Sequence, residues 1–266
     1  MNDDKVTQIE IRDVNKQFVI DKKAVDIVKN INLEFKKGEF ICIVGASGCG
    51  KSTLLRMMAG LENVEDGEIY IGGEKVNEPS LKTGMVFQES RLFPWLNVEK
   101  NIEFGITESK GNKTDSESKN KRVQELIDLV GLKGFEKAIP KQLSGGMQQR
   151  VSIARGLINN PDVLLLDEPF GALDAITRIN MQNEILRIWE TEKKTMVLVT
   201  HDIDEAVYLG DKVVVLSSRP GTIRNIIDVD ISRERDRNSA DFSYIRSKIY
   251  KEFFNDAKTK TPEYYI

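Results

Sequence analysis

Hydrophobic residues along the chain form short runs that alternate with longer amphipathic stretches. Several of the runs are rich in β-branched residues and end at glycine or at a charged residue, which is typical of strands buried on both faces. These runs are Phe40–Val44, Gly84–Phe87, Val163–Leu166, Met196–Val199 and Val213–Leu216. The alternation predicts an α/β fold with a mostly parallel sheet covered by helices.

Three further segments alternate between apolar and polar positions, as strands do when only one face is buried. They lie around Ile9–Val14, Asn30–Phe35 and Glu68–Ile71, and the last of them runs into the turn residues Gly72 and Gly73. We therefore expect a small antiparallel β subdomain attached to the main sheet.

Apolar residues recur three and four positions apart in Val123–Val130 and again from Met147 to Ile158, which marks helix faces turned toward a core. We interpret about residues 90 to 155 as an inserted helical subdomain. Residues 106 to 121 are polar and lack periodicity, so a surface loop is expected there.

The tail of the chain is interpreted as a separate C-terminal helical extension, residues 233–266, after a main domain of residues 1–232. It begins with a charge run from Arg233 to Arg237. Beyond the run, one helical face collects the apolar side chains of Phe242, Ile245, Ile249 and Phe253. This pattern predicts a terminal helix docked on the domain.

Composition narrows the class of protein. Hydrophobic residues make up 40% and charged residues 30%, the balance of a globular chain, and the net charge of −3 provides no positive field for nucleic acid. No apolar run approaches the roughly 20 residues of a transmembrane helix. The N-terminus lacks a secretory signal pattern. The two cysteines, Cys42 and Cys49, lack metal-type spacing, so free thiols in a reducing cytosol are expected.

A phosphate-loop motif follows the first buried strand. It consists of Gly45, Ala46, Ser47, Gly48, Cys49, Gly50, Lys51 and Ser52, with Thr53 opening the helical run behind it. Glycines let backbone N–H groups converge on phosphate oxygens, and the helix N-terminus and Lys51 add positive charge. Ser52 is the expected Mg²⁺ ligand of the motif. The alternative is a turn with an exposed lysine.

Two acidic residues end a second buried strand, where unpaired carboxylates would be costly. Asp167 is predicted to hold Mg²⁺, and Glu168 to orient or deprotonate the water that attacks a γ-phosphate. The alternative is a strand that leaves the core into a charged turn.

A second glycine-rich helix start lies at Ser144, Gly145 and Gly146, with Ser144 as the predicted N-cap. Exposed backbone N–H groups there would make another anion site, for which the same chain offers no evident ligand. An ordinary capped helix is the competing interpretation.

Three single residues are weaker candidates. His201 is the only histidine and follows a buried strand, where its imidazole could bond a γ-phosphate or simply cap a helix. Gln88 ends another strand and is interpreted as a surface glutamine. Phe18 reads first as a core aromatic, although an exposed ring could stack on adenine.

The chain resembles the nucleotide-binding subunit of ABC transporters over roughly residues 5 to 232. The resemblance rests on a set of motifs in a fixed order: the phosphate loop, Gln88, LSGGM, LLLDEP, the residues Gly171 to Asp174 and His201. The resemblance implies a P-loop NTPase fold that binds ATP with Mg²⁺. It implies that Phe18 stacks on adenine, that Gln88 senses Mg²⁺ and the membrane partner, and that His201 is the γ-phosphate switch.

The same resemblance implies a homodimer in which Ser144 to Gly146 close on the ATP held by the opposite subunit and Asp174 contacts across the interface. Transmembrane permease subunits would bind near Arg91 to Leu96, where several large apolar residues lie in a segment that is not expected to be fully buried. The alternative is a plain core segment between helices. The chain would then lie on the cytoplasmic face of the cell membrane, with an extracytoplasmic solute-binding protein as an indirect partner. LSGGMQQR, FGALDAITR and VTHDIDEAV look like the branch that imports nitrate, sulfonates and taurine.

Two other classes compete with this interpretation. A soluble ABC ATPase of ribosomes or DNA would normally carry two such units or basic arms, which this chain lacks. A phosphate-loop kinase or GTPase would explain the loop and Asp167, but not LSGGM or His201.

Overall fold

The computed structural model of the chain describes residues 6–107 and 116–254. The chain divides into two compact units. The first unit combines residues of Met1–Asn77 with residues of Val197–Ile266, and the second is Glu78–Met196.

An antiparallel sheet forms the N-terminal part of the first unit, in the order β2-β1-β4-β5. Its strands are β1 (Thr7–Ile20), β2 (Lys23–Lys36), β4 (Asp66–Ile71) and β5 (Glu74–Lys75). β1 and β2 run longer than their alternating segments, because the turn residues Asp21 and Lys22, with φ of 50° and 63°, allow the hairpin to continue to its tip. The predicted antiparallel subdomain is present.

The remaining strands of the first unit combine parallel and antiparallel pairing. β3 (Phe40–Val44) pairs in parallel with β9 (Lys212–Leu216), and β10 (Ile223–Asp228) pairs antiparallel with β9. β8 (Thr195–Thr200) enters this unit from the second and is buried throughout.

Helices of the first unit pack beside these strands. They are α1 (Lys51–Met58), α6 (Ile203–Leu209) and α7 (Ala240–Phe254). In α7 the side chains of Phe242, Ile245 and Ile249 are buried, as the apolar face of the tail predicts, and α7 contacts α6 and β10.

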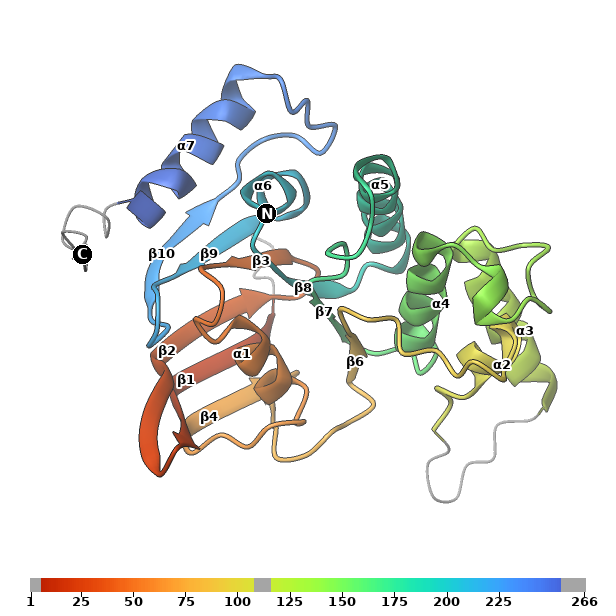
Figure 1. Cartoon of the computed structure of the whole chain (residues 1–266), viewed down its shortest axis with the longest axis horizontal. Helices are drawn as coiled ribbons and strands as arrows, with labels where there is room; N and C mark the ends of the chain where they lie inside the picture. The colour runs from red at the N-terminus through yellow and green to blue at the C-terminus, as the bar shows by residue number, and fades with distance from the viewer. Residues whose placement is uncertain (1–5, 108–115, 255–266) are drawn as a thin grey trace, which may run out of the picture. The chain divides into compact units, whose positions relative to one another are not determined.

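The second unit holds a parallel strand pair, β6 (Thr83–Val86) and β7 (Val163–Asp167). Its helices are α2 (Val98–Glu103), α3 (Ser116–Leu129), the short η1 (Pro140–Gln142), α4 (Gly145–Leu157) and α5 (Ala175–Glu192). Figure 1 shows α2, α3 and α4 lying together within this unit.

One expectation is wrong in part: the predicted surface loop at 106 to 121 becomes helical at Ser116. The first turns of α3 are mostly exposed and polar, and glutamate and lysine form helix well without an apolar face. The segment 108–115 of that loop lies outside the described residues.

The predicted α/β class with parallel strands and an antiparallel subdomain is confirmed. In the part of the chain that the structure describes, no helix has both the length and the apolar character needed to cross a bilayer. Cys42 and Cys49 are buried free thiols.

Candidate active site

The phosphate-loop motif lies between β3 and α1, as predicted. Gly50 is the N-cap of α1 at φ 104°, a left-handed conformation that favours glycine. A Cβ on Gly50 would also lie 2.5 Å from the Cγ1 of Val28. The loop can therefore turn into the helix only with glycine at this position.

Lys51 is 4% exposed, and its Nζ donates to the carbonyl oxygens of Gly45 at 2.9 Å and Ala46 at 3.2 Å. The ammonium group is thus held at the loop beside the first turn of α1, whose N–H groups have no partners within the helix. A cation and a helix N-terminus together form a site for a phosphate group.

Two residues that support this loop were missed in the sequence. The Nε of Arg219 donates to the Gly48 carbonyl at 3.1 Å, and a Cβ on Gly221 would lie 2.2 Å from the Cys49 carbonyl oxygen. The Arg-Pro-Gly turn that holds both residues was the available signal. It packs its backbone directly on the phosphate loop.

Phe18 lies on β1 and is 37% exposed, which excludes the core-aromatic interpretation. The Nζ of Lys16 lies 5.1 Å from the centroid of its ring. Lys16 is buried and pairs with Glu62 at 2.9 Å. The ring is therefore supported by a fixed cation on one side while part of it is open to a ligand.

His201 stands exposed between β8 and α6 in the first unit. The residues around it are tightly bonded: the Thr200 hydroxyl donates to the buried Glu205 at 2.6 Å and accepts the Asp202 N–H at 3.0 Å. Asp202 also caps α6 through the N–H groups of Asp204 and Glu205. The backbone on both sides of His201 is therefore held by hydrogen bonds.

In the second unit, β7 ends at Asp167, which is 5% exposed, and Glu168 follows with φ of 43°. Gln88 Nε2 and Glu168 Oε2 lie 3.3 Å and 3.9 Å from the place that a Cβ on Gly171 would take. The structure therefore brings Gln88 and Glu168 together around a glycine that leaves room for them.

The loop that carries Gln88 is bonded to α4, which the sequence did not indicate. Arg155 donates to the carbonyl oxygens of Ser90 at 2.8 Å and Arg91 at 2.9 Å, and Gln149 donates to that of Phe87 at 3.2 Å. Burial lowers the pKa of Arg155. Since α4 also carries the second glycine-rich motif, that motif and the Gln88 loop share one support.

The second glycine-rich motif opens α4 as predicted. Ser144 is the N-cap, and its Oγ accepts the Met147 N–H at 3.3 Å. Gly145 is exposed, whereas a Cβ on Gly146 would lie only 2.7 Å from the Cγ2 of Thr177 on α5. Gly145 thus leaves the start of α4 accessible, and Gly146 allows α4 to pack closely against α5.

Asp174 lies near this motif, because it is the N-cap of α5, the helix whose Thr177 packs against Gly146. Its Oδ1 accepts the N–H groups of Ile176 at 3.1 Å and Thr177 at 3.0 Å. Hydrogen bonds from the side chain and backbone of Thr177 lower the pKa of Asp174, so the carboxylate is charged at neutral pH.

An exposed aromatic patch lies after the Gln88 loop, and we define it as Phe93, Trp95 and Phe104. Trp95 is 74% and Phe104 62% exposed, and the Phe93 ring centroid lies 5.6 Å and 4.3 Å from theirs. The buried Asn101 fixes the loop by accepting the Phe93 N–H at 2.8 Å and donating to the Leu96 carbonyl at 2.9 Å. This role of Asn101 could not be predicted from the sequence.

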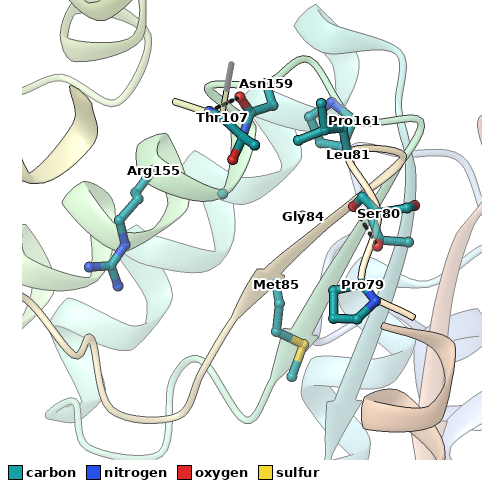
Figure 2. Close-up of a pocket in the computed structure, with 11 residues that line it drawn as sticks. Pro79, Ser80, Leu81, Gly84, Met85, Thr107, Arg155, Asn159 and Pro161 are labelled. Atoms are coloured by element: carbon teal, nitrogen blue, oxygen red, sulfur yellow. Dashed lines mark hydrogen bonds between the residues drawn. The ribbon is translucent and has the colours of Figure 1, made fainter. Parts of the chain in front are cut away.

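A hollow of about 450 Å³ lies at the start of β6 and the end of α4 (Figure 2). Asn159 closes part of its wall by accepting the Thr107 N–H at 3.1 Å. Its lining includes Arg155 but none of the predicted nucleotide or metal residues.

The predicted metal ligands Ser52, Gln88 and Asp167 offer hydroxyl, amide and carboxylate oxygens, which are the donors that Mg²⁺ prefers. No group of three acidic, histidine or cysteine side chains among the described residues could hold a metal by itself. A Mg²⁺ ion that keeps water and phosphate oxygens as ligands needs only one or two protein groups, so the donor types of these residues suit Mg²⁺.

A glycine-rich loop between a parallel strand and a helix, with a buried lysine and an acid-ended second strand, defines the class of P-loop NTPases. A family model described as ABC transporter matches residues 28–171. The chain belongs to the ABC transporter family and is an ATPase of that family.

Relatives support this membership along nearly the whole chain. The Aliphatic sulfonates import ATP-binding protein SsuB of Bacillus subtilis (strain 168) is 49% identical over 249 residues, 94% of each chain. The Nitrate import ATP-binding protein NrtD of Synechocystis sp. (strain ATCC 27184 / PCC 6803 / Kazusa) is 46% identical over 223 residues, 84% of this chain and 83% of the relative.

The fold is similar to a solved structure described as a dimeric post-hydrolysis state of the ATP-binding cassette MJ0796 bound to ADP and Pi. Its TM-score is 0.72 at 33% sequence identity, and the match covers 84% of this chain and all of that one.

Proposed function

We propose that the chain is the ATP-hydrolysing subunit of an ABC importer, and that it works as a homodimer on a separate permease. The solute would be small: nitrate, a sulfonate, taurine or a related compound. The names of the relatives support this class, because two of them import aliphatic sulfonates and nitrate.

The observation that carries the proposal is the pair of glycine-rich helix starts in different units. α1 buries Lys51 in its first turn, whereas the first turn of α4, Gly145 to Gln148, contains no lysine or arginine and exposes Gly145. An anion site lacking a ligand in its own chain suits a phosphate held by a second copy. The dimeric cassette of similar fold, bound to ADP and Pi, agrees with such an arrangement.

In this proposal the residues Gly45 to Thr53 bind the phosphates of ATP, with Lys51 as their counter-charge. Phe18 stacks on the adenine. Ser144, Gly145, Gly146 and Asp174 act on the nucleotide and interface of the opposite copy.

Hydrolysis is assigned to Glu168, Gln88, His201 and Lys51. Glu168 would orient and deprotonate the attacking water, and His201 would contact the γ-phosphate. Ser52, Asp167 and Gln88 would hold a Mg²⁺ ion, which would supply positive charge against the phosphate oxygens.

The permease contact is assigned to the aromatic patch of Phe93, Trp95 and Phe104. Trp95 and Phe104 are too exposed for a core, and large exposed apolar side chains mark partner surfaces. The chain would therefore lie at the cytoplasmic face of the membrane, with a solute-binding protein acting indirectly. Residues 1–232 would form the motor domain and 233–266 an extension.

Glu168→Gln tests the proposal. We expect turnover to fall about 10²-fold or more, and ATP then to trap a dimer that sedimentation detects. Glu190→Gln, at an exposed position of α5, is the matched control. Undiminished hydrolysis without an ATP-dependent dimer would refute the assigned role. Reconstitution with the permease would identify the solute as the compound that stimulates hydrolysis.

A further inference from the structure

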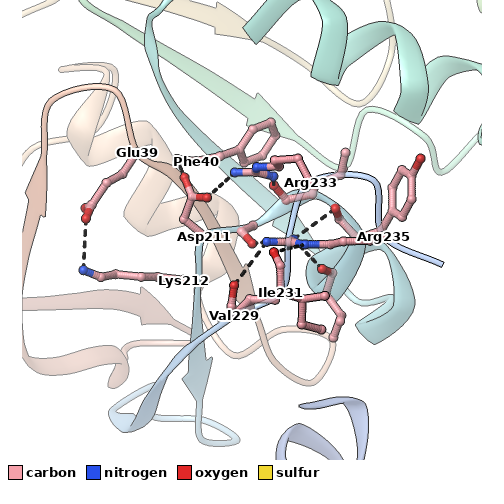
Figure 3. Close-up of polar contacts among 12 residues, drawn as sticks. Glu39, Phe40, Asp211, Lys212, Val229, Ile231, Arg233 and Arg235 are labelled. Carbon is pink, nitrogen blue, oxygen red and sulfur yellow. Dashed lines mark hydrogen bonds and ion pairs between the residues drawn. The ribbon is translucent and has the colours of Figure 1, made fainter. Parts of the chain in front are cut away.

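Arg235 belongs to a charge run, yet it is only 6% exposed. Its guanidinium donates to five backbone carbonyls (Figure 3). These are Val207 at 2.6 Å, Gly210 at 2.7 Å, Tyr208 at 3.1 Å, Val229 at 3.2 Å and Ile231 at 3.3 Å. Arg235 is therefore not a solvated charge. It holds together the backbone of two segments, 207–210 and 229–231.

Three of these carbonyls belong to the C-terminal end of α6. The last carbonyls of a helix have no partner within it and form the negative end of its dipole, so a guanidinium there satisfies both needs. Burial lowers the pKa of Arg235 to about 10, which still leaves it protonated at neutral pH. Arg235 thus closes the end of α6.

A second arginine attaches the same segment to the sheet. Arg233 bonds to the Leu209 carbonyl and to Oδ1 of Asp211, whose Oδ2 accepts the Phe40 N–H at 2.8 Å (Figure 3). Phe40 is the first residue of β3. The C-terminal end of α6 is therefore tied to the strand that leads to the phosphate loop.

The N-terminal end of α6 meets α7. Arg246 of α7 lies 3.6 Å from a carboxylate oxygen of Asp204. Tyr250 and Phe253 of α7 line a pocket of about 560 Å³ together with His201. Residues that follow β10 consequently contact both ends of this seven-residue helix.

We propose that residues 229–254 are a positioning element for His201, with Arg235 as the principal positioning residue. The inference rests on the role proposed for His201. A helix of two turns has little stability of its own, so its place depends on tertiary contacts. Because Asp202 caps α6 directly after His201, displacement of the helix moves the imidazole.

The single histidine makes a direct test available. In untagged protein labelled at histidine, the imidazole NMR signal of His201 reports its surroundings without any hydrolysis. For Arg235→Met we expect that signal to shift, kcat to fall about 10-fold and KM for ATP to change less than about twofold, because the misplaced group acts after binding. Arg235→Lys should lie between Met and wild type.

Leu33→Ala controls for lost stability, because Leu33 is buried on β2 in the antiparallel sheet. It should lower the unfolding midpoint but leave the histidine signal and kcat unchanged. If Arg235→Met does not fold, Phe253→Ala should shift the same signal by a smaller amount.

A variant at Arg235 that loses stability like the control, with the histidine signal and kcat both unmoved, would overturn the inference. His201→Ala separates the two proposals. If it leaves hydrolysis intact while Arg235→Met still shifts the histidine signal, the catalytic role of His201 fails and the positioning contact stands.

Discussion

α1 and α4 both begin at glycine-rich motifs, but their first turns are built differently. α1 starts after Gly50 in a left-handed conformation, has no side-chain cap, and buries Lys51 beside its first turn. α4 starts after Ser144 in an extended conformation, and the hydroxyl of Ser144 caps it.

This difference between the two helix starts indicates two ways of binding a phosphate group. An uncapped helix start with a buried cation gains most from an anion, so α1 is suited to hold the nucleotide through the cycle. A helix that caps itself is complete without a ligand and can add its exposed N–H groups only when a phosphate is delivered. We therefore expect α1 to bind the nucleotide first and α4 to add its N–H groups afterwards.

Lys51→Met should have the largest effect, because it removes the buried positive charge in the first turn of α1. We expect kcat/KM to fall about 10³-fold and ATP to lose its stabilising effect on thermal unfolding. Lys36→Met, at an exposed position of β2, is the control. A Lys51 variant that ATP still stabilises would break the comparison.

Gly145→Asp places a negative charge at the self-capped start. An acidic residue in a first turn stabilises a helix, while it repels phosphate, so we expect hydrolysis to fall about 10²-fold without loss of folding stability. The new Cβ would make only an ordinary contact, 3.7 Å from Leu173. Gly145→Ala, which adds no charge, should keep much more activity. Equal loss in the two variants would point to sterics instead.

Gly146→Ala probes the buried side of the same start. The added Cβ would crowd the Cγ2 of Thr177, and overpacking of this kind costs about 1 to 3 kcal/mol, partly offset by alanine's better helix propensity. Urea unfolding should show the loss, and Thr177→Ser should recover it in the double variant. Failure of that rescue would contradict the contact.

Substitution of Asp174 should have the smallest effect, a small pH-dependent change in the free energy of unfolding. The pKa of Asp174 is lowered in the folded chain, so the carboxylate contributes stability above the unfolded pKa, near 3.9, and loses it as pH falls through the lowered value. The urea midpoint of Asp174→Ala should therefore lie slightly below wild type at pH 7 and converge with it in acid. A difference independent of pH would show that the charge is unimportant.

The sequence allowed prediction where the chemistry is local. The strand Phe40–Val44 and the loop that follows it are read from consecutive residues, and the strand has the same bounds in the structure. The cap at Ser144 was visible for the same reason.

Contacts between distant segments could not be read this way. The carbonyls that bind Arg235 at α6 lie 25 to 28 positions before it, and their proximity results from packing. β10 was missed because its exposed Asn225 and Ile226 break the alternation expected of a strand. Arg155, which supports the Gln88 loop, lies 64 to 65 positions away from the carbonyls that it binds.

Mixing the Lys51→Met and Gly145→Asp chains tests most directly whether one nucleotide is bound by both helix starts from two copies. Each chain alone should be inactive. A mixed dimer would join the intact loop of one chain to the intact α4 of the other, so hydrolysis should return to as much as about a quarter of wild type. Activity that stays at the sum of the two separate chains would contradict the account.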